Sequence, residues 1–325
     1  MNLLTVSGVS KKEEENYVLK NINFIQQPAQ KIAIAGETGS GKSTLLRLIA
    51  GLVQPDFGQI LFEGNKVKGP LEKLLPGHPQ IAYLSQSFEL RNNYRVEELL
   101  QMACKVSDND AKSIYSICKI DYLLNRWSDE LSGGERQRVA FAKTLVSAPK
   151  LLLLDEPFSN LDAIHRNILK NIISDIEERL NVTIILVSHD PVDVLSWAEE
   201  IIVLDHGKMI QRGTPQEIYK YPMNEYVAGL FGKYSMISPE IIELFPLLDQ
   251  DRRRFVRPND FVLSLNKNDG IAAEIEDIQF MGSYFETEVS CQGNKFIITT
   301  NAFFDKGTIA FVRLAADIEQ SHHLE

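Results

Sequence analysis

A glycine-rich segment near the N-terminus has the composition and spacing of a phosphate-binding loop. Residues 36–43 read Gly-Glu-Thr-Gly-Ser-Gly-Lys-Ser, follow the apolar run 32–35 and precede a helix-like stretch. Glycines allow successive backbone N–H groups to point into one concavity, and the start of a helix adds partial positive charge there. We therefore expect a polyphosphate in this loop, with Lys42 reaching its β- and γ-phosphates and the Ser43 hydroxyl holding Mg²⁺. The alternative, a Gly/Ser-rich turn without a ligand, is disfavoured by the strand and helix that flank the loop.

Two adjacent carboxylates, Asp155 and Glu156, follow the apolar run 151–154. Ligands of open α/β sheets lie beyond the C-terminal ends of the strands, so both side chains should face the same crevice as Lys42. Asp155 then suits Mg²⁺ bound through a water, and Glu156 suits polarising an attacking water. Taken alone, the pair also fits a solvated strand end before a turn at Pro157.

A second candidate anion-binding segment, Leu-Ser-Gly-Gly-Glu-Arg-Gln-Arg, spans residues 131–138. It precedes a helix-like stretch that runs to about residue 146, so Ser132, Gly133 and Gly134 lie at a helix N-terminus. This is either an ordinary helix N-cap or a second phosphate contact. Because one nucleotide rarely needs two such loops from the same chain, the second reading implies the nucleotide of another subunit.

The elements that must position these residues follow an α/β pattern over residues 1–234. Apolar runs of strand length, separated by amphipathic segments such as 164–180, indicate strands buried on both faces of a largely parallel sheet. These runs are 31–35, 80–84, 151–154, 182–187 and 201–204. Residues 96–127 have helical character, and we expect a helical subdomain over about residues 88–148.

The pattern changes near residue 235, where we expect a second domain over residues 235–323. Residues 235–325 carry 8 Lys and Arg against 15 Asp and Glu, and β-branched and aromatic segments replace the long helices. The expected strands are 261–265, 271–280, 284–289, 295–299 and 308–314. Turn residues at 282–283, 292–294 and 305–307 indicate hairpins, so residues 250–315 should form a small antiparallel barrel or sandwich.

The composition narrows the class of protein. The chain has 325 residues, of which 44% are apolar and 24% charged, and its net charge of −10 argues against a protein that binds nucleic acid by neutralising phosphates. We find no run near the roughly 18 apolar residues that span a bilayer and no signal-peptide pattern, and we expect a chain that is neither secreted nor membrane-spanning by itself. Three scattered cysteines fit a reducing compartment.

Taken together, six segments resemble the motif series of ATP-binding-cassette (ABC) ATPases in order and spacing. They are 36–44, Gln86, 131–137, 151–157, 159–162 and 188–190. The resemblance covers about residues 1–232 and implies a P-loop NTPase core with a helical subdomain, with ATP and Mg²⁺ as cofactors. The nucleotide-contacting residues that it implies are Gly36, Glu37, Thr38, Gly39, Ser40, Gly41, Lys42, Ser43, Thr44, Ser132, Gly133, Gly134 and Asp162.

The resemblance also implies roles for side chains that lie at strand ends. Glu156 acts on the attacking water, and His189 contacts the γ-phosphate and steadies Glu156. Gln86 touches Mg²⁺ and the water, so that the implied metal ligands are Ser43, Gln86 and Asp155. Family members usually place an adenine-stacking aromatic residue before the strand at 19–22. The nearest aromatic residue here is Tyr17, which either stacks on adenine or is an ordinary strand residue.

The partners follow from the same resemblance. It implies a head-to-tail homodimer in which the phosphate loop of one subunit and Ser132–Gly134 of the other enclose each ATP, with Asp162 in a loop that crosses the interface. It further implies two transmembrane permease subunits, onto which the helical segment docks, and an extracytoplasmic binding protein acting through them. The chain would then lie peripherally at the cytoplasmic face of the cell membrane, without a nucleic-acid partner.

The C-terminal region resembles, on fewer residues, the transport-associated OB-like domain of importer ATPases. Residues 255–260 read Phe-Val-Arg-Pro-Asn-Asp, and the expected strands follow them. This implies the ATPase of an importer of a small solute such as ferric ion, polyamine, oxyanion or sugar. The domain either senses a ligand, for which its acidic balance favours a cation, or only enlarges the dimer interface.

Two other functions compete with an importer ATPase. A soluble cassette ATPase acting on nucleic acid or ribosomes usually has two cassettes, a long coiled-coil insertion or cysteine clusters, none of which this sequence contains. A regulatory module that binds nucleotide without hydrolysing it is opposed by the intact set of Lys42, Asp155, Glu156 and His189.

Overall fold

The computed structural model describes residues 2–315 except 160, 237, 239–242, 244, 246–254 and 268. Asn160 of the predicted motif 159–162 and the end of the predicted second domain, residues 316–323, therefore lie outside the described residues. The chain divides into two compact units, Met1–Pro215 and Gln216–Glu325, and each is considered separately.

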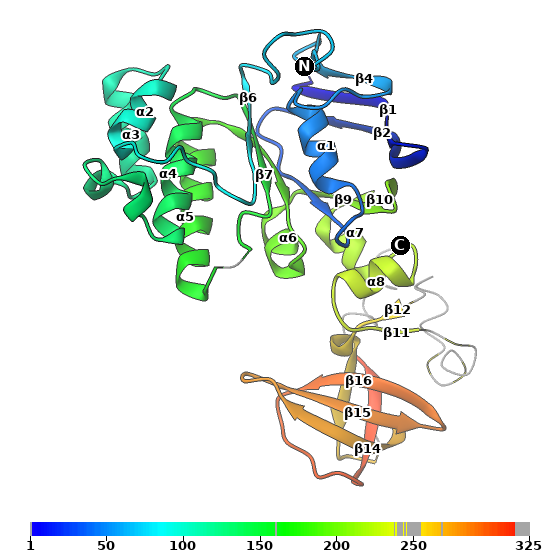
Figure 1. The fold of residues 1–325 in the computed structure, drawn as a ribbon. Helices are drawn as coiled ribbons and strands as arrows, with labels where there is room; N and C mark the ends of the chain where they lie inside the picture. Colours follow the sequence, from blue (N-terminus) through cyan, green and yellow to red (C-terminus); the bar gives the residue numbers. More distant parts are fainter. Residues whose placement is uncertain are drawn as a thin grey trace. The chain divides into compact units, whose positions relative to one another are not determined.

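The first unit is built on a six-stranded sheet with the strand order β10-β9-β3-β8-β7-β6 (Figure 1). Its strands are β3 (Ile32–Ala35), β6 (Ile81–Leu84), β7 (Leu151–Asp155), β8 (Thr183–Val187), β9 (Glu200–Asp205) and β10 (Lys208–Gly213). All neighbours run parallel except β10, which pairs antiparallel with β9. The largely parallel sheet expected from the apolar runs is confirmed, since β3, β7 and β8 are buried along their whole length.

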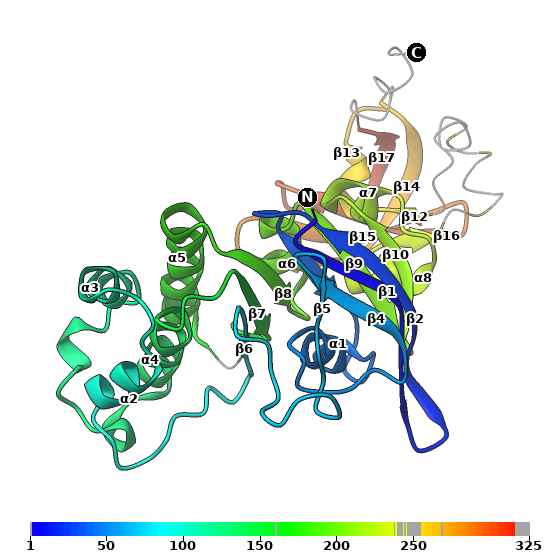
Figure 2. The same ribbon diagram turned by 90° about the horizontal axis from the view of Figure 1, so that it is seen from above.

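Helices cover both faces of this sheet, and Figure 2 shows α1 on one side and α4 and α5 on the other. The helices of the first unit are α1 (Lys42–Ile49), α2 (Val96–Ala103), α3 (Asp108–Ile117), α4 (Gly133–Leu145), α5 (Ala163–Leu180) and α6 (Pro191–Trp197), with 3₁₀ turns η1 (Asp121–Leu123) and η2 (Ser128–Glu130). Alternate residues of β7 pack on opposite faces: Leu151 and Leu153 share a core with α1, while Leu152 and Leu154 share one with α4 and α5.

A second, antiparallel sheet completes the first unit; the sequence predicts a strand at 19–22 and a β-rich stretch around Gly58 and Gly64, but not their pairing in one sheet. Its order is β2-β1-β4-β5, formed by β1 (Leu4–Glu13), β2 (Asn16–Gln26), β4 (Phe57–Phe62) and β5 (Asn65–Lys66). The turn between β1 and β2 has Glu14 at a φ of +54°, and the inward residues of these strands pack with α1 in one core. This sheet therefore holds α1, and the loop before it, from the side opposite the main sheet.

The second unit contains a curved antiparallel half-barrel of the OB-like type, with strand order β13-β17-β14-β15-β16. Its elements are α7 (Pro215–Lys220), α8 (Glu225–Leu230), β11 (Ser235–Met236), β12 (Phe255–Val256), η3 (Pro258–Asp260), β13 (Phe261–Ser264), β14 (Ile271–Phe280), β15 (Phe285–Cys291), β16 (Asn294–Thr300) and β17 (Ile309–Leu314). All five barrel strands coincide with predicted segments, because their alternating apolar residues fill one core.

One predicted hairpin in this unit is wrong. The turn at 305–307 does not join paired strands, because β17 pairs with β13 and β14, whereas β16 pairs with β15. Instead, the turn lies against β14, where Gly307 N–H donates to the carbonyl of Ile275. Turn residues alone specify a change of direction, and the neighbour of the next strand is chosen by packing of the whole barrel.

Arg257 explains why the division between the two compact units precedes the compositional change at residue 235. Its side chain is 3% exposed and donates hydrogen bonds to the carbonyls of Tyr219, Ala228 and Gly232, at 3.1, 2.9 and 3.1 Å. These contacts attach α7 and α8 to the C-terminal unit. The functional division at 234/235 stays a prediction.

Candidate active site

The loop between β3 and α1 has the backbone conformation that a phosphate cradle requires. Gly36 has a φ of +149°, and a Cβ built on it would lie only 2.3 Å from the carbonyl oxygen of Leu204 and 2.7 Å from Ser40 Oγ. Only glycine fits there. At the other end of the loop, Gly41 is the N-cap of α1 and supplies no side-chain cap, so the first turn of α1 presents its N–H groups without one.

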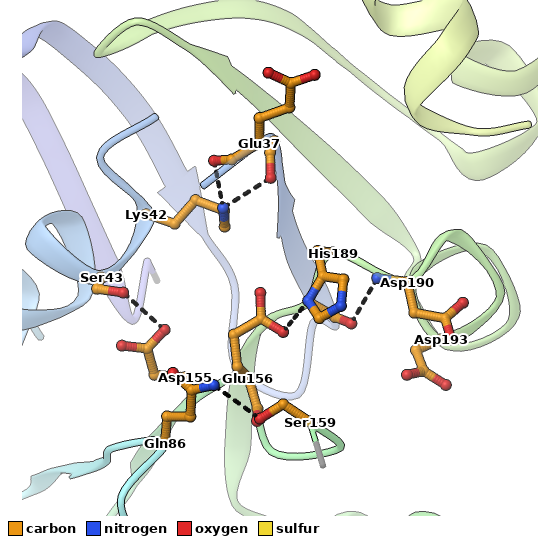
Figure 3. A network of polar contacts seen from close by, with 12 residues as sticks. Glu37, Lys42, Ser43, Gln86, Asp155, Glu156, Ser159, His189, Asp190 and Asp193 are labelled. Carbon is orange, nitrogen blue, oxygen red and sulfur yellow. Dashed lines mark hydrogen bonds and ion pairs between the residues drawn. The ribbon is translucent and has the colours of Figure 1, made fainter. Parts of the chain in front are cut away.

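Lys42 is the cation of this loop, and only 7% of it is exposed. Its Nζ donates to the carbonyls of Gly36 and Glu37 at 2.7 and 2.8 Å, which curls the side chain back over the loop (Figure 3). Burial lowers the pKa of Lys42, while the nearby carboxylates of Glu156, Asp155 and Glu37 act in the opposite direction.

Asp155 ends β7 on the face that α1 covers, as the alternation along the strand requires. It is 4% exposed, and its two oxygens have different partners: Ser43 Oγ donates to Oδ1 at 3.0 Å and the Tyr83 hydroxyl donates to Oδ2 at 2.8 Å. The structure thus brings together the two residues expected to hold Mg²⁺. Sequence reasoning missed Tyr83, although its alternation with buried Ile81 in β6 places it on the same face.

Glu156 leaves the strand with a φ of +52°, which turns its side chain away from the direction that β7 would give it. The carboxylate meets His189, whose Nδ1 lies 2.6 Å from Glu156 Oε2. The Glu156 side chain is 15% exposed and that of His189 is 65% exposed, so the carboxylate is sheltered and the imidazole is open to solvent. Figure 3 shows both side chains near Lys42 and Ser43.

Gln86 is linked to Glu156 through the side chain of Ser159. Its Nε2 donates to Ser159 Oγ at 3.1 Å, and that hydroxyl donates to the backbone carbonyl of Glu156 at 2.8 Å. The segment after β6 and the segment after β7 are therefore connected at the backbone of Glu156. This contact was not predicted: Ser159 belongs to the motif segment 159–162, but the sequence does not indicate that it meets Gln86.

Most of these groups line one cavity of about 580 Å³. It is lined by Glu13, Val18, Thr38, Gly39, Gly41, Lys42, Ser43, Thr44, Gln86, Glu156 and His189. Of the other predicted loop residues, Gly36 and Glu37 hold Lys42 through their carbonyls, and Ser40 is buried below the loop. Tyr17 is not among the lining residues, and the ammonium groups of Lys12 and Lys20 lie over its ring at 4.7 and 5.4 Å.

The second glycine segment does not line this cavity. Ser132 is the N-cap of α4 in a capping box, where its Oγ accepts from Glu135 N–H at 3.3 Å and its own N–H donates to Glu135 Oε2 at 2.9 Å. A Cβ on Gly134 would lie 2.7 Å from Cδ2 of His165, so the imidazole packs directly on this glycine. The N-cap alternative is thus confirmed as local structure, and a contact with another subunit's nucleotide stays a prediction.

Asp162, which was expected at a subunit interface, caps the helix that follows it. Its Oδ1 accepts from His165 N–H and its Oδ2 lies 2.8 Å from His165 Nδ1. These hydrogen bonds lower the pKa of the Asp162 carboxyl. Like Ser132–Gly134, Asp162 is absent from the lining of the cavity.

Two contacts that sequence reasoning missed support the loops of the site, and the first of them is buried. Gln137 of α4, 2% exposed, donates from its amide to the carbonyl of Pro157, which follows the two carboxylates. Arg166 of α5 pairs with Asp190, the neighbour of His189, at 2.5 Å. Gln137 and Asp190 stand in the recognisable motifs, but the partner of each depends on the packing of α4 and α5.

The helices of the described residues include none that is long and apolar enough to cross a membrane.

Comparison with known proteins gives consistent matches. The family model described as "ABC transporter" matches residues 19–159. The chain is 32% identical to the spermidine/putrescine import ATP-binding protein PotA of Clostridium acetobutylicum, over 91% of this chain and 89% of that protein. It is also 32% identical to the sulfate/thiosulfate import ATP-binding protein CysA of Synechocystis sp., over 91% of this chain and 86% of that protein. A match of this length continues into the C-terminal unit.

A solved structure of an ATP-binding cassette also matches about two thirds of this chain. The dimeric, post-hydrolysis structure of the ATP-binding cassette MJ0796 with ADP and Pi superimposes with a TM-score of 0.57 at 26% identity, covering 65% of this chain and 98% of that one.

Proposed function

The chain belongs to the ATP-binding subunits of ABC transporters, which hydrolyse ATP to drive transport, and from this premise we propose that it powers the import of a small solute. The observation that carries the proposal is the convergence of Lys42, Ser43, Asp155, Glu156 and His189 at one cavity or its wall. A cation in a glycine cradle, paired oxygen donors and a sheltered carboxylate are the parts that phosphoryl transfer to water requires.

Mg²⁺ fits the residues present. The Ser43 hydroxyl and the Asp155 carboxylate are hard oxygen donors that already lie 3.0 Å apart, and Gln86 lines the same cavity. When bound, Mg²⁺ offsets the negative charge of the β- and γ-phosphates. Ser43, Asp155 and Gln86 would hold it, while Lys42 turns from the two loop carbonyls to the phosphates.

Glu156 is proposed to orient the attacking water and to accept its proton. Its carboxylate is sheltered and lines the cavity, and His189 holds one of its oxygens at 2.6 Å. The imidazole is the more exposed partner and is placed to contact the γ-phosphate. In this assignment Glu156 and Gln86 act on the water, and His189 fixes the direction of the carboxylate.

The proposed active form is a head-to-tail homodimer. Ser132, Gly133 and Gly134 begin a 13-residue helix outside the cavity of their own chain, and a Cβ on Gly133 would meet no protein atom within 4 Å. Such a helix N-terminus suits the phosphates held by a second copy. Asp162 would then lie where the two copies meet, and the dimeric structure of the related cassette MJ0796 supports this arrangement.

The remaining partners are proposed from family membership. Two transmembrane permease subunits would dock on the helical part, an extracytoplasmic binding protein would act through them, and the chain would lie at the cytoplasmic face of the membrane. One relative is named as a polyamine importer subunit and another as a sulfate importer subunit, and both are 32% identical to this chain. The proposed cargo is therefore a class, which includes ferric ion, polyamine, oxyanion and sugar, and residues 235–323 are proposed as a regulatory domain.

Mixing two inactive variants tests the dimer and the site together. Ser132→Arg blocks the contact made in trans, and Lys42→Ala removes the charge of the phosphate cradle. In a mixed dimer one composite site is intact and the other carries both lesions, so ATPase activity should partly recover. ATP-dependent association of the mixture, measured by light scattering, is the second readout.

The proposal is contradicted if position 132 lies next to the nucleotide of its own chain. If a crosslinker attached at position 132 reacts with the nucleotide bound to Lys42 of the same chain, the head-to-tail site is wrong. Failure of the mixture both to hydrolyse ATP and to associate in its presence would also count against it. Each variant measured alone is the matched control.

A further inference from the structure

Tyr83 contacts the carboxylate that is proposed to hold the metal. It lies in β6, pairs in register with Leu153 of the neighbouring parallel strand β7, and points to the sheet face that α1 covers. Its hydroxyl donates to Asp155 Oδ2 at 2.8 Å. Because Asp155 is almost fully buried, this oxygen is removed from water and Tyr83 supplies the hydrogen bond that water would otherwise provide.

The hydroxyl also has a charged neighbour on α1. Arg47 lies close enough to the Tyr83 oxygen that their interaction raises the pKa of Arg47. Burial, followed by donation to Asp155, raises the pKa of Tyr83 to about 12.

The two oxygens of Asp155 are distinguished by these contacts. Ser43 Oγ donates to Oδ1 at 3.0 Å, while Oδ2 is held by Tyr83. The carboxylate cannot rotate about its Cβ–Cγ bond without losing both hydrogen bonds. Oδ1 consequently stays on the side of Ser43 and the cavity, and Oδ2 stays turned into the sheet.

We propose that Tyr83 is a positioning residue that fixes the Asp155 carboxylate for Mg²⁺ bound between Asp155 and Ser43. This inference rests on the proposed function, because it needs the metal to bind at that pair. Tyr83 is absent from the lining of the cavity and does not act on the nucleotide, so its effect reaches the metal through Asp155.

The expected effect of losing this hydrogen bond is specific for the metal. Partners that orient a metal ligand typically change metal affinity by about 10- to 100-fold when removed. The phosphate cradle consists of the loop backbone and Lys42, whereas the hydrogen bond that the Tyr83 hydroxyl donates goes to Asp155. The affinity for nucleotide without metal should therefore change by less than about two-fold.

The test is Tyr83→Phe, which removes one oxygen atom and keeps the ring. Mn²⁺ bound to the complex of the full chain with ADP is titrated by EPR, and ADP binding in EDTA is measured by calorimetry. We expect Mn²⁺ to bind about 10-fold more weakly, with ADP affinity in EDTA preserved. The matched control is Tyr115→Phe, which removes the hydroxyl of a partly buried tyrosine in α3 and should change neither quantity.

Three outcomes would overturn the inference, and they are distinguishable. Mn²⁺ affinity within two-fold of wild type would show that Tyr83 does not position Asp155. Equal weakening of Mn²⁺ and of ADP in EDTA would indicate a general structural role. Wild-type protein that binds ADP equally well in Mg²⁺ and in EDTA would contradict the metal assignment of the proposed function itself.

Discussion

Two glycines of the same phosphate loop should respond to alanine in different ways. Gly36 has a φ of +149°, and a Cβ there would lie 2.3 Å from the backbone oxygen of Leu204 in β9. Gly39 has a φ of +85°, and its Cβ would meet no protein atom within 4 Å. Gly39 lines the cavity and Gly36 does not. Alanine at position 36 therefore strains the fold, while alanine at position 39 projects a methyl group toward the phosphates.

The magnitudes follow from these distances. For Gly36→Ala, overpacking against a strand backbone and the unfavourable φ each contribute about 1–3 kcal/mol, which together give roughly 4 kcal/mol. Gly39→Ala has only the strain of a positive φ, about 1–2 kcal/mol. At about 2–4 °C per kcal/mol for a unit of this size, calorimetry should find a Tm loss near 12 °C for Gly36→Ala and near 4 °C for Gly39→Ala.

Nucleotide binding separates the two variants further. Gly39→Ala should weaken ADP binding by about 5- to 150-fold, because an added methyl group in a close-fitting site costs about 1–3 kcal/mol. The reasoning would be refuted if Gly39→Ala lowered Tm more than Gly36→Ala did. It would also be refuted if Gly39→Ala bound ADP as tightly as the wild type, since the cradle would then not hold the phosphates.

Three further predictions concern charged groups. Lys42→Met should lower ATP turnover by about 10²-fold or more. The same variant should change the free energy of unfolding by only about 1 kcal/mol, because burial lowers the pKa of Lys42 and so opposes its charge in the folded state. Since that folded pKa lies below 10.5, urea titrations at rising pH should find the wild type gaining stability relative to this variant as Lys42 loses its proton. Glu156→Gln should retain ATP and elute as a dimer in size-exclusion chromatography with ATP and Mg²⁺, and a monomer at saturating ATP would contradict the sandwich arrangement. Arg257→Met should destabilise the C-terminal unit by about 3 kcal/mol, because it removes the hydrogen bonds to the carbonyls of Tyr219, Ala228 and Gly232, which hydrogen exchange in α7 and α8 would detect.

The sequence predicts those parts of the fold that depend on local pattern. The runs at 31–35 and 151–154 are apolar enough to be strands buried on both faces, and the glycine loop between a strand and a helix leads directly to Lys42. Asp155 and Glu156 were predicted at the same crevice because parallel strands end at one edge. The contacts between Glu156 and His189 and between Ser43 and Asp155 agree with that expectation.

The sequence does not predict contacts whose partner is chosen by packing. Tyr83 reads as one more residue of an apolar strand, and its hydrogen bond to Asp155 depends on the register of β6 against β7. The turn at 305–307 has hairpin residues, yet β17 crosses to β14 because the barrel core places it there. In both cases the local pattern gives the element, and the neighbour is set by residues that are distant in the sequence.

A site divided between two copies makes hydrolysis depend on association. In the proposed arrangement ATP contacts the cradle around Lys42 in one chain and Ser132–Gly134 in the other, so that ATP binds the dimer more tightly than the monomer. A ligand that prefers one state stabilises it by RT ln(1 + [L]/Kd), which is about 2.7 kcal/mol at 100 times Kd for each site. In that arrangement, hydrolysis followed by loss of the released phosphate would remove the γ-phosphate contacts to His189 and to the partner's helix N-terminus, and much of that stabilisation would be lost. The two copies would then separate, and this opening is the movement that a pair of permease subunits attached to them would receive.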